Sequence, residues 1–114
     1  MKIEMIRNIC NALPAVTEDI KWENDLCFSV GSKMFCTASL ESLNVSFKVP
    51  DEQFAILAER EGFTPAPYLA RAKWVTATEA ARVSEAEWKT FIAQSYELVR
   101  SKLTGKTRKA LGID

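Results

Sequence analysis

The residues of this chain best suited to chemistry are cations that can hold phosphate groups. Two cations and an indole are close together in sequence: Arg71, Lys73 and Trp74. Two lysines from earlier segments, Lys33 and Lys48, could join them in one candidate patch. Guanidinium and ammonium groups bind phosphate oxygens, and an indole can stack on a base or a sugar. The patch predicts contact with nucleic acid, double-stranded DNA being the expected partner. Against this, Trp74 lies in an apolar segment that is more typical of a buried strand, and surface lysines are often only solvated charges.

Residue types for catalysis or metal binding are sparse. The 114 residues include no histidine, the commonest general base and metal ligand, so catalytic centres built on histidine are excluded within the chain. The three cysteines, Cys10, Cys27 and Cys36, contain no CxxC pair, and packing is the favoured role for each. The acidic residues between positions 18 and 25 lack the spacing of an oxygen-ligand loop. We expect no enzymatic activity, no metal and no cofactor.

Overall charge gives no long-range attraction to nucleic acid or to acidic membranes. Lysine and arginine total 15, as do aspartate and glutamate, so the formal net charge is zero. Any contact with DNA would need a local patch. A second concentration of positive charge lies near the C-terminus, at Arg100, Lys102, Lys106, Arg108 and Lys109. Cations there would favour the dipole of a preceding helix, and the alternative is a basic arm on phosphates.

The elements that must position these residues can be read from hydrophobic periodicity. Apolar residues three and four apart predict a helix over residues 2–13, which Pro14 stops. Residues 17–22 are expected to form a strand. Residues 26–30 and 33–37 predict a hairpin around Gly31 and Ser32, with a type II′ turn. A two-residue loop would place Phe28 opposite Phe35, and Cys27 opposite Cys36.

The second half alternates between strands and helices. Alternation over residues 43–49 predicts a half-buried strand, and Asp51 is expected to cap a helix that runs to about Arg60 before Gly62. We expect a loop over residues 63–68 and a short strand over residues 73–77. Ser84 and Glu87 form a capping box for a last helix that Gly105 would end.

These elements predict the fold class. The order α-β(4)-α-β-α, with short turns between strands, is typical of an α+β two-layer sandwich whose antiparallel sheet carries helices on one face. We expect residues 1–114 to form a single domain, with a short basic tail from about residue 104. No apolar run is long enough to span a bilayer, and the first residues lack a signal-peptide pattern, so we expect no membrane contact and a cytoplasmic location.

Several segments, in order, resemble one family. They are residues 12–22 (ALPAVTEDIKW), 28–35 (FSVGSKMF), 65–75 (PAPYLARAKWV) and 95–103 (SYELVRSKL). Over nearly the whole chain they are similar to the MmcQ/YjbR family of small bacterial proteins. The resemblance implies a fold like that of type III secretion chaperones, and a DNA-binding role with a double-wing arrangement. Many relatives have histidine where this chain has Lys73. A chemical role of that histidine would be lost here, whereas a role as a positive or hydrogen-bonding group could be filled by lysine.

Two other functions stay open. A protein-interaction or chaperone-like module, as a homodimer or with another protein partner, would need an exposed apolar patch, for which Met34 and Trp22 are candidates. A small-ligand binder would need a pocket near Tyr68, Arg71 and Trp74.

Overall fold

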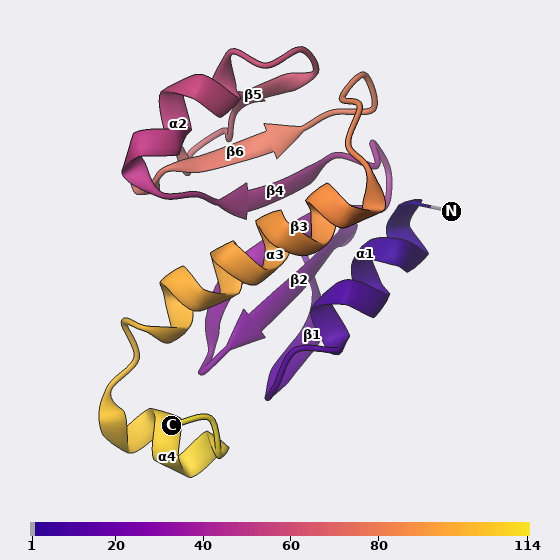
Figure 1. The fold of residues 1–114 in the computed structure, drawn as a ribbon. Helices are drawn as coiled ribbons and strands as arrows, with labels where there is room; N and C mark the ends of the chain where they lie inside the picture. The colour runs from indigo at the N-terminus through magenta and orange to yellow at the C-terminus, as the bar shows by residue number, and fades with distance from the viewer. Residues whose placement is uncertain (1) are drawn as a thin grey trace.

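A six-stranded antiparallel sheet forms one layer of the protein, and helices cover one of its faces (Figure 1). The computed structural model describes residues 2–114. In chain order the elements are α1 (Lys2–Asn11), β1 (Val16–Lys21), β2 (Asp25–Val30), β3 (Lys33–Ser39), β4 (Val45–Lys48), α2 (Asp51–Ala58), β5 (Phe63–Pro65), the 3-10 turn η1 (Ala70–Ala72), β6 (Trp74–Ala77), α3 (Glu85–Arg100) and α4 (Gly105–Leu111). The expected α+β two-layer class is confirmed.

The strand order across the sheet is β1-β2-β3-β4-β6-β5, and every neighbouring pair is antiparallel. The sixth strand is β5, which we expected to be a loop because Pro65 falls within it. The expectation was wrong because β5 is an edge strand that pairs only with β6. A proline at a sheet edge does not interrupt the hydrogen bonds between strands.

The β2–β3 hairpin differs from its expected turn and register. Gly31 and Ser32 both have positive φ, at 58° and 67°, which defines a type I′ turn instead of type II′. Phe35 is an extra residue, so Phe28 lies opposite Cys36 and Cys27 lies opposite Thr37. This β-bulge overturns the expected pairing of Cys27 with Cys36.

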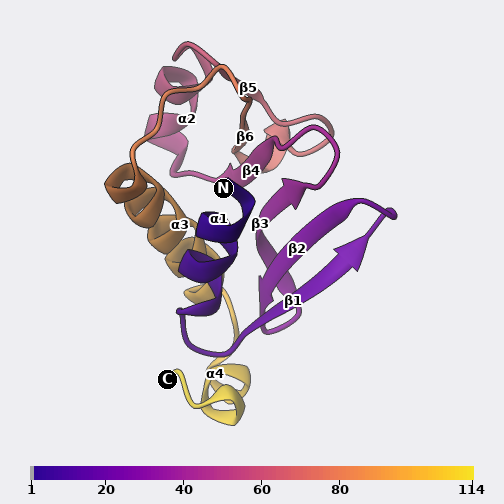
Figure 2. The same ribbon diagram turned by 90° about the vertical axis from the view of Figure 1, so that its right-hand side faces the viewer.

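The core lies between the sheet and the helices α1 and α3, which Figure 2 shows on the same side of the sheet. The ring of Phe35 meets that of Tyr96 in α3 edge-on, with centroids 5.5 Å apart. Phe47 of β4 contacts the rings of Phe63, Trp88 and Phe91. These contacts hold α3 across the middle of the sheet.

Helix boundaries follow the expected signals at some ends only. Ser84 and Glu87 form the predicted capping box of α3, and the Glu87 N–H donates to the Ser84 hydroxyl over 3.1 Å. Asp51 is the first residue of α2 and not its cap, because Pro50 holds the cap position and no side chain caps the helix. Gly105 begins α4 instead of ending α3, so the predicted basic tail is mostly helical. None of the helices within residues 2–114 is long and apolar enough to cross a membrane.

Candidate functional site

Three lysines from separate elements surround one small hollow, which we call the lysine site. Lys33 begins β3, Lys48 ends β4 and Lys102 follows the end of α3. The hollow has a volume of about 280 Å³, and its apolar wall is formed by Met34, Leu98, Val99 and Leu103. Two of these lysines, Lys33 and Lys48, belong to the patch predicted from sequence, and Lys102 joins them because α3 ends beside the β2–β3 turn.

Lys48 is held in place through both its backbone and its side chain. Its carbonyl oxygen accepts a hydrogen bond from the Ser95 hydroxyl in α3. Its ammonium group donates to the Ala72 carbonyl oxygen in η1 over 2.5 Å. An ammonium has three donors, so two of them are not used by this bond.

The electrostatics of the lysine site disfavour the charged form of Lys48. Burial lowers the pKa of the Lys48 ammonium, the charge of Lys102 lowers it further, and the carboxylate of Asp51 opposes both effects. An anion bound beside Lys48 and Lys102 would favour the charged form of Lys48 and so oppose the repulsion between the two ammonium groups. The arrangement is suited to a phosphate or another oxyanion.

The other three residues of the predicted patch lie elsewhere. Arg71 is exposed on η1, next to the carbonyl that Lys48 contacts. Lys73 has a φ of 64°, and its ammonium lies 5.1 Å from the centre of the Phe54 ring in α2. Trp74 is only 5% exposed, so its indole is part of the protein interior and is not available for stacking on a base.

A second and larger hollow lies on the sheet face opposite the helices, and we call it the open-face pocket. Its volume is about 620 Å³. It is lined by Trp22, Asp25, Met34, Thr37, Ser46, Ala66, Pro67, Tyr68 and Leu69. The sequence predicts Tyr68 at a pocket, and it makes Trp22 and Met34 candidates for an exposed apolar patch. Arg71 and Trp74, the other two pocket candidates, are not among the lining residues.

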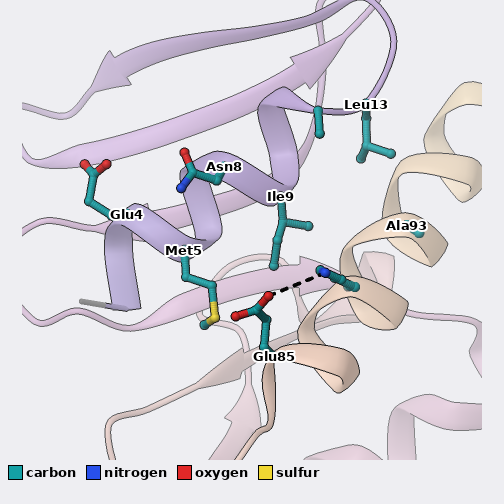
Figure 3. Close-up of a pocket in the computed structure, with 9 residues that line it drawn as sticks. Glu4, Met5, Asn8, Ile9, Leu13, Glu85 and Ala93 are labelled. Carbon is teal, nitrogen blue, oxygen red and sulfur yellow. Dashed lines mark ion pairs between the residues drawn. The ribbon is translucent and has the colours of Figure 1, made fainter.

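A third hollow, of about 670 Å³, separates α1 from α3 (Figure 3). Its walls are mainly apolar, with Met5 and Ile9 from α1 and Leu13 from the turn that follows it. The charged pair beside them, Lys89 and Glu85, is joined at 3.4 Å within α3. Because these two charges pair with each other, they are not left free for a ligand. The groove therefore resembles an ordinary packing interface between two helices.

The cysteine thiols and the carboxylates do not assemble a metal site in the described part of the chain. Residues 2–114 contain no group of three or more His, Cys, Asp or Glu side chains placed to hold a metal ion. The three cysteines are buried and free. A hydrogen bond with Cys10, together with burial, raises the pKa of the Cys36 thiol well above its usual value. Such thiols stay protonated and are poor nucleophiles.

Comparison with known proteins gives a consistent result. A protein of Deinococcus radiodurans, DR2400, with a DUF419 domain, is 27% identical and superposes with a TM-score of 0.84, covering 98% of this chain and 88% of its own. A protein of Pseudomonas syringae is 18% identical with a TM-score of 0.69, covering 88% of this chain and 99% of its own. No curated protein matches the sequence. The model of the YjbR family matches residues 11–98, and the chain therefore belongs to the YjbR family.

Proposed function

We propose that this protein binds DNA without catalysing a reaction on it, and that the lysine site holds backbone phosphates. The observation that supports this most is the convergence of Lys33, Lys48 and Lys102, from three elements, on one hollow. Arg71, exposed on the neighbouring turn, would extend the contact along the backbone. A cytoplasmic location, expected from the free thiols, belongs to the same proposal.

Binding at this site would be local and weak. The net charge of the chain is zero, so attraction depends on the patch and not on the whole molecule. Non-specific DNA binding typically has dissociation constants of about 10⁻⁴ to 10⁻⁶ M at physiological salt. We expect this protein to fall in that range, with tighter binding at low salt because released counterions drive association.

Fluorescence anisotropy of labelled duplex DNA across a salt series tests the proposal. The double variant Lys33→Gln/Lys102→Gln should lose at least about tenfold in affinity at low salt and lower the salt slope by about 2. The control Arg82→Gln/Lys89→Gln removes the same charge from exposed positions outside the lysine site and should change little. Equal losses from both pairs, or no binding by the wild type at low salt, would reject this function.

A further inference from the structure

The two aromatic side chains that are exposed on this protein border the same hollow. Among the described residues, six large hydrophobic side chains are exposed, and the aromatic ones are Trp22, which is 68% exposed, and Tyr68, which is fully exposed. Both line the open-face pocket. They come from distant segments, the β1–β2 turn and the loop before η1, on the side of the sheet away from α1 and α3 (Figure 2). Rings placed this way offer flat apolar surfaces to a ligand.

Packing does not explain the backbone conformation at these two residues. Trp22 has a φ of 50° and Tyr68 a φ of 65°, in the left-handed region that bulky residues rarely adopt. Glycine or asparagine would meet the same turn geometry with less strain. Because neither side chain is buried, the fold does not gain core contacts from the aromatic type. Strain of this kind often accompanies sites where the side chain serves a ligand.

The polar lining of the pocket matches the edge of a base and not a phosphate. Asp25 contributes a carboxylate, which repels phosphate but accepts hydrogen bonds from amino groups such as N4 of cytosine. Thr37 and Ser46 contribute hydroxyls, and the Ser46 hydroxyl is already paired with that of Thr76 at 2.8 Å. The volume of about 620 Å³ lies in the range of about 300–1,000 Å³ that small-molecule pockets occupy.

The open-face pocket and the lysine site are adjacent. Met34 lines both hollows, and its neighbour Lys33 supplies one of the three cations. A second connection runs through η1, because Lys48 donates to Ala72 just beyond the pocket wall at residues 66–69. An aromatic pocket beside a cationic hollow has the layout of a nucleotide, with its base on one side and its phosphate on the other.

We propose that the open-face pocket takes the unpaired base of a single-stranded nucleic acid whose neighbouring phosphate sits at the lysine site. This inference rests on the proposed function, since the same lysines hold the phosphate. Base pairs in a duplex stay stacked and cannot enter the pocket. The protein would therefore prefer single strands over duplex, and bases with an amino group facing Asp25 over thymine.

The test compares a labelled eight-nucleotide oligodeoxycytidylate with a labelled duplex, by anisotropy and by tryptophan fluorescence. Trp74 and Trp88 are buried, so quenching on binding reports Trp22. Trp22→Ala and Tyr68→Ala should each weaken oligodeoxycytidylate binding by about 5- to 100-fold and leave duplex binding unchanged. Ile56→Ala, which removes an exposed apolar side chain from α2, is the control and should change neither. Asp25→Asn should reduce the preference for oligodeoxycytidylate over oligothymidylate. If the site takes a free nucleotide as well, deoxycytidine monophosphate should compete weakly with the labelled oligodeoxycytidylate.

The outcomes separate the two proposals. If the lysine variant weakens both ligands and the aromatic variants weaken neither, the DNA-binding function stands and the base pocket is rejected. If no nucleic acid binds at low salt, both fail. If sedimentation velocity shows self-association that Trp22→Ala abolishes while oligonucleotide affinity is unchanged, the pocket belongs to a second copy of the chain and this inference is overturned.

Discussion

The hydroxyl of Tyr96 in α3 donates a 2.7 Å hydrogen bond to the carbonyl oxygen of Pro14, 82 positions earlier in the chain. The bond connects α3 to the turn between α1 and β1. We expect Tyr96→Phe to lower the free energy of unfolding by about 1 kcal/mol, the usual net value of one hydrogen bond. Urea unfolding measures this change. Tyr68→Phe removes a hydroxyl from a fully exposed ring and should have no effect, so equal losses from both variants would contradict the assigned role of Tyr96.

The same hydroxyl should make stability sensitive to alkaline pH. Burial raises the pKa of Tyr96, the charge of Arg100 opposes this effect, and the carboxylate of Glu97 adds to it. A folded-state pKa above the unfolded value of about 10 means that the stabilisation is complete below pH 10 and is lost as pH rises further. Above about pH 10 the wild type should lose more stability than Tyr96→Phe does. If the unfolding free energies of the two proteins fell with the same slope above about pH 10, Tyr96 would not contribute to the pH dependence of stability.

Gly62 should tolerate no side chain. Its φ is 85°, and an added Cβ would lie 2.2 Å from the backbone nitrogen of Ala81. We expect Gly62→Ala to cost about 1–2 kcal/mol for the left-handed backbone and about 1–3 kcal/mol for the collision. Gly112 has a similar φ of 72° with open space around it, so Gly112→Ala isolates the backbone cost alone. Thermal unfolding of both variants measures the difference, and equal melting temperatures would contradict the predicted collision.

The ion pair between Arg60 and Glu87 should make the free energy of unfolding depend on pH under acid conditions. Arg60 donates two hydrogen bonds to the Glu87 carboxylate, at 2.8 and 3.0 Å, and these lower the pKa of Glu87. A lowered folded-state pKa stabilises the protein above the unfolded value of about 4.3, and that stabilisation is lost as pH falls through the folded value. Arg60→Met should therefore reduce the acid dependence of unfolding below about pH 4.3. Lys89→Met removes an exposed pair and serves as the control.

Lysine titration can test the geometry of the lysine site without any ligand. Because the charge of Lys102 lowers the pKa of Lys48, Lys102→Gln should raise that pKa toward its usual value. Asp51→Asn removes the opposing carboxylate and should lower it further. Carbon-detected NMR titration of the lysine side chains measures both shifts. A Lys48 pKa that is unaffected by Lys102→Gln would place the two ammonium groups farther apart than the structure has them.

Local signals account for the parts of the fold that were predicted correctly. The capping box at Ser84 and the alternation at Val45 and Phe47 depend only on residues near them in sequence. The bulge at Phe35 was missed because no local pattern marks it, and the ring contact of Phe35 is with Tyr96, which is far along the chain. At Gly105 the sequence showed a helix breaker, whereas the Thr104 hydroxyl accepts from the Thr107 N–H and starts a new helix.

The candidate site could be predicted only where it depends on local sequence. Lys33 and Lys48 could be named because one lies at the tip of a recognisable hairpin and the other on the polar face of a recognisable strand. That Lys102 joins them depends on the direction of α3 over the sheet, which local sequence does not determine. The burial of Trp74 agrees with its apolar segment, which favoured a buried strand over stacking on a base.

The position of α3 across the sheet has a consequence during synthesis. Ribosomes release the N-terminal part of a chain first, at about 5–20 residues per second, so β2, β3 and β4 emerge well before α3. Until α3 arrives, the apolar faces of Phe28, Phe35 and Phe47 have no complete cover. A message truncated before the codon for residue 85 would yield a chain without α3. Its apolar strand faces would stay exposed and could associate with other nascent chains.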